Sequence, residues 1–356
     1  MQRRVTCQGA KITEEGALAL QLANNIVNIS KKLRKAATTK DTSRFYRYYR
    51  CRKTSVADLV PGDKVLLLRQ HGGVGDILVM TQLLNEFARR YPKCDLTFAC
   101  REGFHSLFKD VKGINIFPYE MVHFDGWVED GSDLFHTAVT DCYDMVMDLT
   151  IPCHVWEEIM FDPQLCQFRN RLDMWGNWIG MYDFPRNVKS CVRIGVDDIQ
   201  HVMERYIKPV DNSPIAIVAP TSANVHKDYL FYSELIAALA KHGYHVVAVG
   251  ERQKMRKAKN VIHTSTYREF LSLFYAANLV VSVDSAAFHA GGIAEAKTFG
   301  IFNTNDGVTY SRYYPTAVPI QVCDKRCIWK YCTPGNCIGR RQHEIVMSTL
   351  REHGVL

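Results

Sequence analysis

The chain has 356 residues, of which 47% are hydrophobic and 23% are charged. That length allows two domains with separate cores, and the composition is typical of a folded globular protein rather than a disordered chain. No apolar run approaches the roughly 20 residues that cross a bilayer, and no signal peptide follows the first methionine. We therefore expect a cytoplasmic protein, of a bacterium or of a virus-infected host cell, without a transmembrane anchor.

The positive charge is concentrated at the N-terminus. Residues 1–60 contain 13 Lys and Arg against 4 Asp and Glu, a net charge of +9, whereas the other 296 residues contain 31 against 33, a net charge of −2. Apolar residues at helical spacing predict a helix over residues 13–37, and aromatic residues alternate with cations over 43–53. Such an asymmetry favours a polyanionic partner, and the alternative is a helical arm that keeps the protein soluble.

After this basic extension, short apolar runs that favour strands alternate with helical patterns. The strands expected first are Lys64–Arg69, Asp95–Cys100, Ile114–Phe117 and Met145–Leu149, with a helix from Ile77 to Tyr91 that Pro92 stops. Trp156, Trp175 and Trp178 indicate a packed helical region between residues 150 and 210.

The alternation then restarts. The next strands are expected at Pro214–Pro220, Tyr244–Val249, Leu279–Val283 and Thr298–Phe302, with helices at Phe231–Leu239, Tyr267–Ala276, Ala287–Ala296 and Gln342–His353. Two such series predict an α/β protein of two Rossmann-like domains whose parallel sheets face across a cleft. The expected divisions are the extension 1–60, an N-terminal domain 61–205, a C-terminal domain 206–340 and a final helix 341–356.

A glycine-rich turn, Gly72-Gly73-Val74-Gly75-Asp76, separates the first expected strand from its helix. Gly73 and Gly75 allow the backbone to turn tightly and to approach a ligand, and the amide groups of the helix start suit an anion. The motif is neither G-x-G-x-x-G nor a P-loop. Asp76 is placed to act as a general base on an acceptor hydroxyl, and the alternative is an N-cap aspartate.

Two further loops carry polar residues at the ends of expected strands. Thr221, Ser222 and Lys227 follow the strand that ends at Pro220, and hydroxyls with a lysine before a helix suit a diphosphate. The alternative is a polar loop with a capping hydroxyl.

The second of these loops begins at Asp284. Asp284, Ser285 and His289 follow the strand Leu279–Val283, where they would point at phosphates or at a sugar. The alternative for a histidine one turn into a helix is a structural role.

Together these segments resemble the ADP-heptose–lipopolysaccharide heptosyltransferases, glycosyltransferase family nine. The resemblance covers roughly residues 62–350. The chain is similar to a divergent member of the family, which a virus could encode. The segments that carry it are LLRQHGGVGDILVMTQLLNEFARRYP, APTSANVHKDYLFYSELIAAL, VAVGERQK, FLSLFYAANLVVSVDSAAFHAGGIAEAKTFGIFNTND and the cysteine-bearing CDKRCIWKYCTPGNCI.

The resemblance implies the GT-B fold and an inverting, metal-independent transfer from a nucleotide-diphosphate sugar, with an N-terminal acceptor domain and a C-terminal nucleotide-sugar domain. It implies that Asp76 is the base, that Thr221, Ser222 and Lys227 hold the diphosphate, that Glu251 binds ribose hydroxyls, and that Asp284 and His289 face the donor sugar. Ala286-Ala287 replaces the usual Gly-Pro and Asn303-Thr304-Asn305 replaces Gly-Pro-Thr. These changes fall where the donor is expected, so the sugar need not be a heptose.

Four of the twelve cysteines, Cys323, Cys327, Cys332 and Cys337, lie within 15 residues. Their spacing is not that of a zinc ribbon, although four thiolates could still hold a structural Zn²⁺. The alternative is a set of reduced cysteines in a tight loop.

Three hypotheses remain for what the chain acts on. A hydroxymethylated pyrimidine in DNA is narrowly favoured, because Phe45, Tyr46, Tyr48 and Tyr49 could stack on unpaired bases beside cations that suit phosphates. A lipopolysaccharide or another surface glycan is the alternative acceptor. A non-catalytic module that binds a nucleotide sugar or a nucleic acid is the third hypothesis, and Asp76 argues against it.

Overall fold

The computed structural model describes most of the chain beyond the basic extension. The described residues are 53, 55–69, 72–118, 142–149, 170–208, 212–258, 261–303, 305–322 and 339–356. Contacts divide the chain into two units, one of residues 1–72, 80–167 and 171–184 and the other of residues 73–79, 168–170 and 185–356. The helix expected over 13–37, the four aromatic residues at 45–49 and the four clustered cysteines lie outside the described residues.

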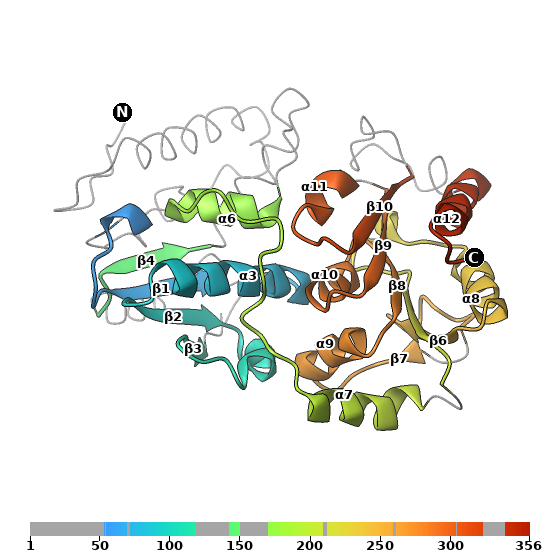
Figure 1. Ribbon diagram of the computed structural model, residues 1–356, viewed down its shortest axis with the longest axis horizontal. Coiled ribbons are helices and arrows are strands. Elements are labelled where there is room, and N and C mark those ends of the chain that lie inside the picture. The colour runs from blue at the N-terminus through green and yellow to red at the C-terminus, as the bar shows by residue number, and fades with distance from the viewer. Residues whose placement is uncertain are drawn as a thin grey trace, which may run out of the picture. The chain divides into compact units, whose positions relative to one another are not determined.

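The first unit contains a four-stranded parallel sheet in the order β3-β2-β1-β4 (Figure 1). Its strands are β1 Lys64–Arg69, β2 Asp95–Cys100, β3 Asn115–Pro118 and β4 Met145–Asp148. Val65 pairs with Leu96 on one side and with Met145 on the other, so β1 is central. The direction of winding reverses beside β1, and its carboxyl end is therefore where an open α/β sheet binds ligands.

The helices of this unit follow from local apolar spacing. Among the described residues they are η2 Val56–Asp58, η3 Glu102–Phe108, α6 Arg171–Ile179 and the part of α3 Val74–Arg90 from residue 80 onwards. Ile77, Leu84 and Phe87 recur at helical spacing along α3 and are fully buried. Trp175 of α6 is buried with the Arg69 guanidinium 5.4 Å above its ring, so the helical region expected around this tryptophan is confirmed.

The second unit contains a six-stranded parallel sheet in the order β10-β9-β8-β5-β6-β7. Its strands are β5 Ile215–Ala219, β6 His245–Val249, β7 Val261–Ile262, β8 Leu279–Val283, β9 Lys297–Phe302 and β10 Ala317–Gln321. The chain first adds strands on one side of β5 and then continues on the other side with β8. This reversal puts the expected ligand position at the carboxyl ends of β5 and β8.

Helices lie on both faces of the second sheet. They are α7 Val196–Val202, η5 Val225–Lys227, α8 Tyr232–Lys241, α9 Tyr267–Tyr275, α10 Ala286–Ile293, α11 Gly307–Ser311 and α12 Arg340–Glu352. Figure 1 shows α8 and α12 on one face and α9 and α10 on the other. The core agrees, because Leu235 of α8 and Val346 of α12 share a buried cluster with Val281 and Ile301 of the sheet.

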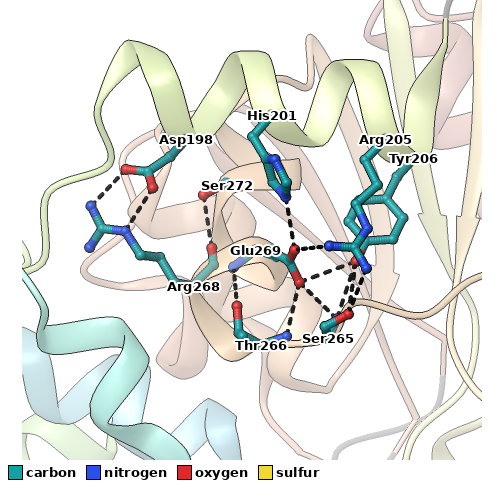
Figure 2. A network of polar contacts seen from close by, with 9 residues as sticks. All are labelled: Asp198, His201, Arg205, Tyr206, Ser265, Thr266, Arg268, Glu269 and Ser272. Carbon is teal, nitrogen blue, oxygen red and sulfur yellow. Dashed lines mark hydrogen bonds and ion pairs between the residues drawn. The ribbon is translucent and has the colours of Figure 1, made fainter.

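A polar network fastens α7 to α9 (Figure 2). Arg268 of α9 is 8% exposed, and its guanidinium donates to both carboxylate oxygens of Asp198 on α7, at 2.8 and 2.6 Å. Residues 185–205, which the sequence analysis assigns to the first domain, therefore group with the second unit.

Glu269, in the first turn of α9, is the centre of the same network. α7 continues as a π-helical segment, η4 Met203–Ile207, and Arg205 and Tyr206 of this segment donate to the Glu269 carboxylate. Thr266 caps α9, and its backbone N–H donates back to Glu269. Burial would raise the pKa of Glu269, but hydrogen bonds from His201, the backbone at residues 265 and 266, and Tyr206 hold it below its usual value.

The α/β architecture with two parallel sheets is thus confirmed. In the part of the chain that the structure describes, no helix is both long and apolar enough to cross a bilayer. The cytoplasmic location stays a prediction.

The Asp198–Arg268 contact should contribute measurably to stability. We expect Asp198→Ala to lower the free energy of unfolding by about 1.5–3 kcal/mol, because it removes a charged acceptor from a buried guanidinium. Urea unfolding measures this loss.

The matched control is Lys189→Ala, which breaks an ion pair with Glu295 in the same unit. Both of these side chains are more than half exposed, at 59% and 53%, so this loss should be only about 0–1 kcal/mol. Equal losses in the two variants would contradict a special role for the Asp198–Arg268 contact.

Candidate functional site

The candidate site lies where the strand order of the second sheet reverses. Because all six strands are parallel, the loops that follow β5, β6, β8 and β9 leave the sheet at one edge. Thr221, Ser222 and Lys227 follow β5, and Asp284 follows β8, which is hydrogen-bonded to β5. The fold therefore brings the two polar loops that the sequence singled out to neighbouring strand ends.

A buried ion pair joins these two loops. The Lys227 ammonium lies 2.8 Å from Oδ2 of Asp284, whose residue is only 4% exposed. Asn305, after β9, donates from its side-chain amide to the same oxygen. Burial alone would raise the pKa of Asp284, but Lys227, His289 and the Asn305 amide hold it below its usual value, so the carboxylate is charged at neutral pH.

Ser285 and His289 are positioned by α10. Ser285 is the N-cap, and its hydroxyl accepts a hydrogen bond from the backbone N–H of Ala287. His289 is buried one turn later, with Nδ1 2.9 Å from the Tyr314 hydroxyl. Burial raises the pKa of Tyr314 far above its usual value, so its hydroxyl keeps its proton and can donate to His289. Sequence reasoning did not single out Tyr314, which lies far along the chain.

The loop after β5 is shaped by its own polar groups. The Ser222 hydroxyl donates to the carbonyl of Asn224 at 2.7 Å and accepts from the Asn224 N–H at 3.1 Å. The Ser222 N–H donates to Asp228 at 2.7 Å. Thr221 and Ser222 are both half-buried. Because the Ser222 hydroxyl bonds to Asn224, it stabilises the loop, which agrees with the alternative that these residues form a structural polar loop.

Lys254 is a neighbour of this loop that sequence reasoning missed. It follows β6, and its ammonium donates to the Ser222 carbonyl at 2.6 Å and lies 3.3 Å from the exposed carboxylate of Glu251. A sequence signal for Lys254 was present, because this residue ends the segment VAVGERQK that resembles the family. Only the pairing of β5 with β6 brings it to the Ser222 loop.

The glycine-rich turn of the first motif leads into α3. Gly72 has φ +113°, a conformation that favours glycine, and α3 begins at Val74. Asp76 is half-buried in the first turn of α3, two residues beyond its first residue, so it is not the N-cap. A carboxylate there is still favoured by the helix dipole, which keeps a purely structural interpretation open.

A side chain at Gly75 would be crowded by neighbouring atoms. Residues 73–79 group with the second unit, and a Cβ on Gly75 would lie 3.2 Å from Cα of Ala286 and 3.2 Å from Cδ2 of His289. The start of α3 thus packs against the start of α10. A Cβ on Gly73 would meet open space, so packing does not require glycine there.

The asparagines that replace Gly-Pro-Thr are internal. Asn303 and Asn305 are buried, and they are hydrogen-bonded to Gln342 and to Asp284 respectively. These contacts hold α12 and the loop after β8 in place. They give the two asparagines a structural role that sequence reasoning did not foresee, because it placed them against the donor.

Among the described residues, no three His, Cys, Asp or Glu are grouped to hold a metal ion. The four cysteines proposed for zinc lie outside those residues, so the zinc site stays a prediction.

No family model matches the chain, and no curated protein matches its sequence. Solved structures do match. One is the glycosyl transferase family 9 protein from Veillonella parvula DSM 2008, with 14% identity over 83% of this chain and 98% of its own, at a TM-score of 0.61. Another is the E. coli ADP-heptose lps heptosyltransferase II, with 14% identity over 81% and 99% at a TM-score of 0.56.

A third is the E. coli heptosyltransferase WaaC in a structure with ADP, with 15% identity over 81% and 99% at a TM-score of 0.55. At such identities the likeness shows a shared fold. It confirms the GT-B fold that the sequence analysis expected.

The Lys227–Asp284 pair makes a prediction about pH. We expect Lys227→Met to lower the free energy of unfolding by about 3–5 kcal/mol at neutral pH, because it leaves a buried carboxylate without its cation. In the wild type the pKa of Asp284 is lowered, so its contribution is complete above the ordinary value of 3.8 and is lost as the pH falls through the lowered value. In the variant, burial should raise this pKa above its unfolded value.

The deficit of the variant should therefore shrink as the pH falls from 7 towards 4, because the buried carboxyl then takes up a proton. Urea unfolding of both proteins at several pH values measures it. The control is Lys227→Met combined with Asp284→Asn, whose stability relative to the wild type should lack this trend. A deficit that stays constant over this range would contradict the assignment.

Proposed function

We propose that this protein is a glycosyltransferase that moves a sugar from a nucleoside-diphosphate sugar to a hydroxyl acceptor, with inversion at the anomeric carbon. The observation that carries the proposal is the Lys227–Asp284 pair at the reversal of the second sheet. Support comes from the shared fold with a heptosyltransferase whose structure was determined with ADP.

For the donor, the proposed roles follow from charge and exposure. An ammonium has three N–H donors, so Lys227 can keep its contact with Asp284 and also contact phosphate oxygens. Thr221 and Ser222 stand on the same loop as Lys227. The Ser222 N–H and hydroxyl donate to Asp228 and Asn224, so a contact of Ser222 with phosphate requires these hydrogen bonds to rearrange. Glu251 is exposed after β6 and suits the ribose hydroxyls. Asp284 itself is buried beneath Lys227, so we assign it the task of holding that lysine.

For the chemistry, Asp76 accepts the proton of the acceptor hydroxyl as the acceptor oxygen forms a bond to the anomeric carbon. The bond from that carbon to the diphosphate breaks at the same time, and the nucleoside diphosphate leaves with the electron pair. Lys227 stabilises the negative charge that develops on the diphosphate. Independence from a catalytic metal is part of this proposal.

For the acceptor, we place a glycan such as lipopolysaccharide first. The names of the matching heptosyltransferases support it at least as well as DNA. One reason for DNA was the changed sequence at residues 303–305. Asn303 and Asn305 are buried and hydrogen-bonded to Gln342 and Asp284, which gives this change a structural explanation as well. The other reason, the basic extension with its aromatic residues, lies largely outside the described residues. DNA stays the second hypothesis.

Asp76→Asn tests the catalytic base. We expect transfer to fall by about 10²–10⁴-fold while donor affinity is unchanged, because the amide cannot take up the acceptor proton. Steady-state kinetics and calorimetry with the donor measure the two quantities.

The matched control is Asp173→Asn. Asp173 is also half-buried and occupies the same position in the first turn of α6. If Asp76 only stabilises the start of its helix, the two variants should lose stability alike and both should keep activity. Near wild-type turnover by Asp76→Asn would reject the base.

A panel of donors and acceptors tests the proposed reaction as a whole. The full chain is incubated in EDTA with ADP, UDP or GDP sugars and either a lipopolysaccharide core or hydroxymethylated DNA, and products are identified by mass spectrometry. We expect sugar transfer to the glycan. Transfer to DNA alone would move the acceptor to the second hypothesis, and activity only after addition of Mg²⁺ or Mn²⁺ would reject metal independence. Binding of a nucleotide sugar without any transfer would favour the non-catalytic module.

A further inference from the structure

The loops after β5 and β6 lie against each other beside the candidate site. Gly250 has φ +156°, and a Cβ there would lie 2.6 Å from the Thr221 hydroxyl and 2.8 Å from the sulfur of Met255. A side chain at this position would force the Thr221 and Met255 side chains to move. The two loops are therefore packed closely enough for a side chain of one to fix the backbone of the other.

Lys254 makes that connection. Its ammonium donates to the Ser222 carbonyl at 2.6 Å and lies 3.3 Å from Glu251 and 3.9 Å from Asp228. The Lys254 side chain is 24% exposed, against 56% for Glu251. A hydrogen bond between partly buried groups is screened less by water than a surface contact, so this one can hold a fixed geometry.

Residue 222 is held from both sides. Its N–H donates to Asp228 at 2.7 Å, and its carbonyl accepts from Lys254. Burial raises the pKa of Asp228, while the Ser222 N–H and Lys254 act to lower it. Lys254 therefore supports this backbone position directly and also through Asp228.

We propose that Lys254 is a positioning residue that couples ribose recognition to phosphate recognition in the donor site. It holds the Glu251 carboxylate and the backbone at Ser222 in one arrangement, so that Glu251 and the loop that carries Thr221 and Lys227 meet the same nucleoside diphosphate. This inference rests on the proposed function, in which Glu251 binds ribose hydroxyls and the loop of Ser222 and Lys227 binds the diphosphate. It adds a residue outside those two contact sets and predicts that they do not act independently.

The test compares ribose with deoxyribose ligands. Binding of ADP, UDP and GDP and of their 2′-deoxy forms is measured by calorimetry on the full chain, and the pair that the wild type binds most tightly is used. We expect Lys254→Met to weaken the ribonucleotide by about ten- to hundredfold. It should also reduce the preference for ribose over deoxyribose towards that of Glu251→Gln. The double variant should lose less than the two single losses together.

The matched control is Lys257→Met, which removes the same charge from an exposed side chain three residues further on. It should bind both ligands as the wild type does. A second variant, Lys254→Gln, keeps a donor for the Ser222 carbonyl but lacks the charge that faces Glu251. It should lose mainly the preference for ribose, and it decides the question if Lys254→Met does not fold.

The outcomes separate this inference from the proposed function. If the wild type binds no nucleoside diphosphate or nucleotide sugar, the proposed function fails, and the coupling fails with it. If the wild type binds and Lys254→Met or Lys254→Gln keeps the full ribose preference, only the coupling is overturned. Equal weakening of both sugar forms also overturns it, because Lys254 would then act only on the phosphates.

Discussion

A buried carboxylate needs a compensating cation, and at the end of β8 this need brings three loops together. Asp284 receives Lys227 from the loop after β5 and the Asn305 amide from the loop after β9. Breaking such a pair leaves an uncompensated charge in the interior, so moving any of these loops away would lower the free energy of unfolding. The loop that Lys227 fixes also presents the Ser222 carbonyl to Lys254, which extends the same constraint to the end of β6.

Local patterns were enough to predict most elements of the second unit. The strand expected at Leu279–Val283 is β8 without a change of boundary, because an uninterrupted apolar run buried on both faces has little alternative. The helix expected at Tyr267–Ala276 is α9, one residue shorter, and Thr266 with Glu269 forms the capping box that starts it. Gly243 has φ +85° just after α8, a left-handed conformation in which glycine commonly ends a helix.

What escaped prediction depends on contacts between distant residues. β10 was missed because it contains Pro319, which strands tolerate only at an edge, and β10 is an edge strand. The contact of Lys254 with Ser222 forms because β5 pairs with β6, and the sequence alone does not reveal this pairing. The hydrogen bonds of Asn303 with Gln342 and of Asn305 with Asp284 also escaped prediction, because polar residues after a strand suggest ligand contact.

The charges at the candidate donor site favour selection over simple attraction of anions. Lys227 and Lys254 face the three carboxylates of Asp228, Glu251 and Asp284, so these side chains together offer a bare phosphate no net positive charge. A nucleoside diphosphate can satisfy both signs, since its ribose hydroxyls donate to a carboxylate while its phosphates accept from a lysine. DNA has phosphates but lacks the 2′-hydroxyl, so it would gain less from this edge of the sheet. Attraction to a nucleic acid therefore has to come from another part of the chain, and residues 1–60 carry the required +9. In the function that we propose, donor choice thus rests on this edge of the second sheet, and the charges there do not decide the acceptor.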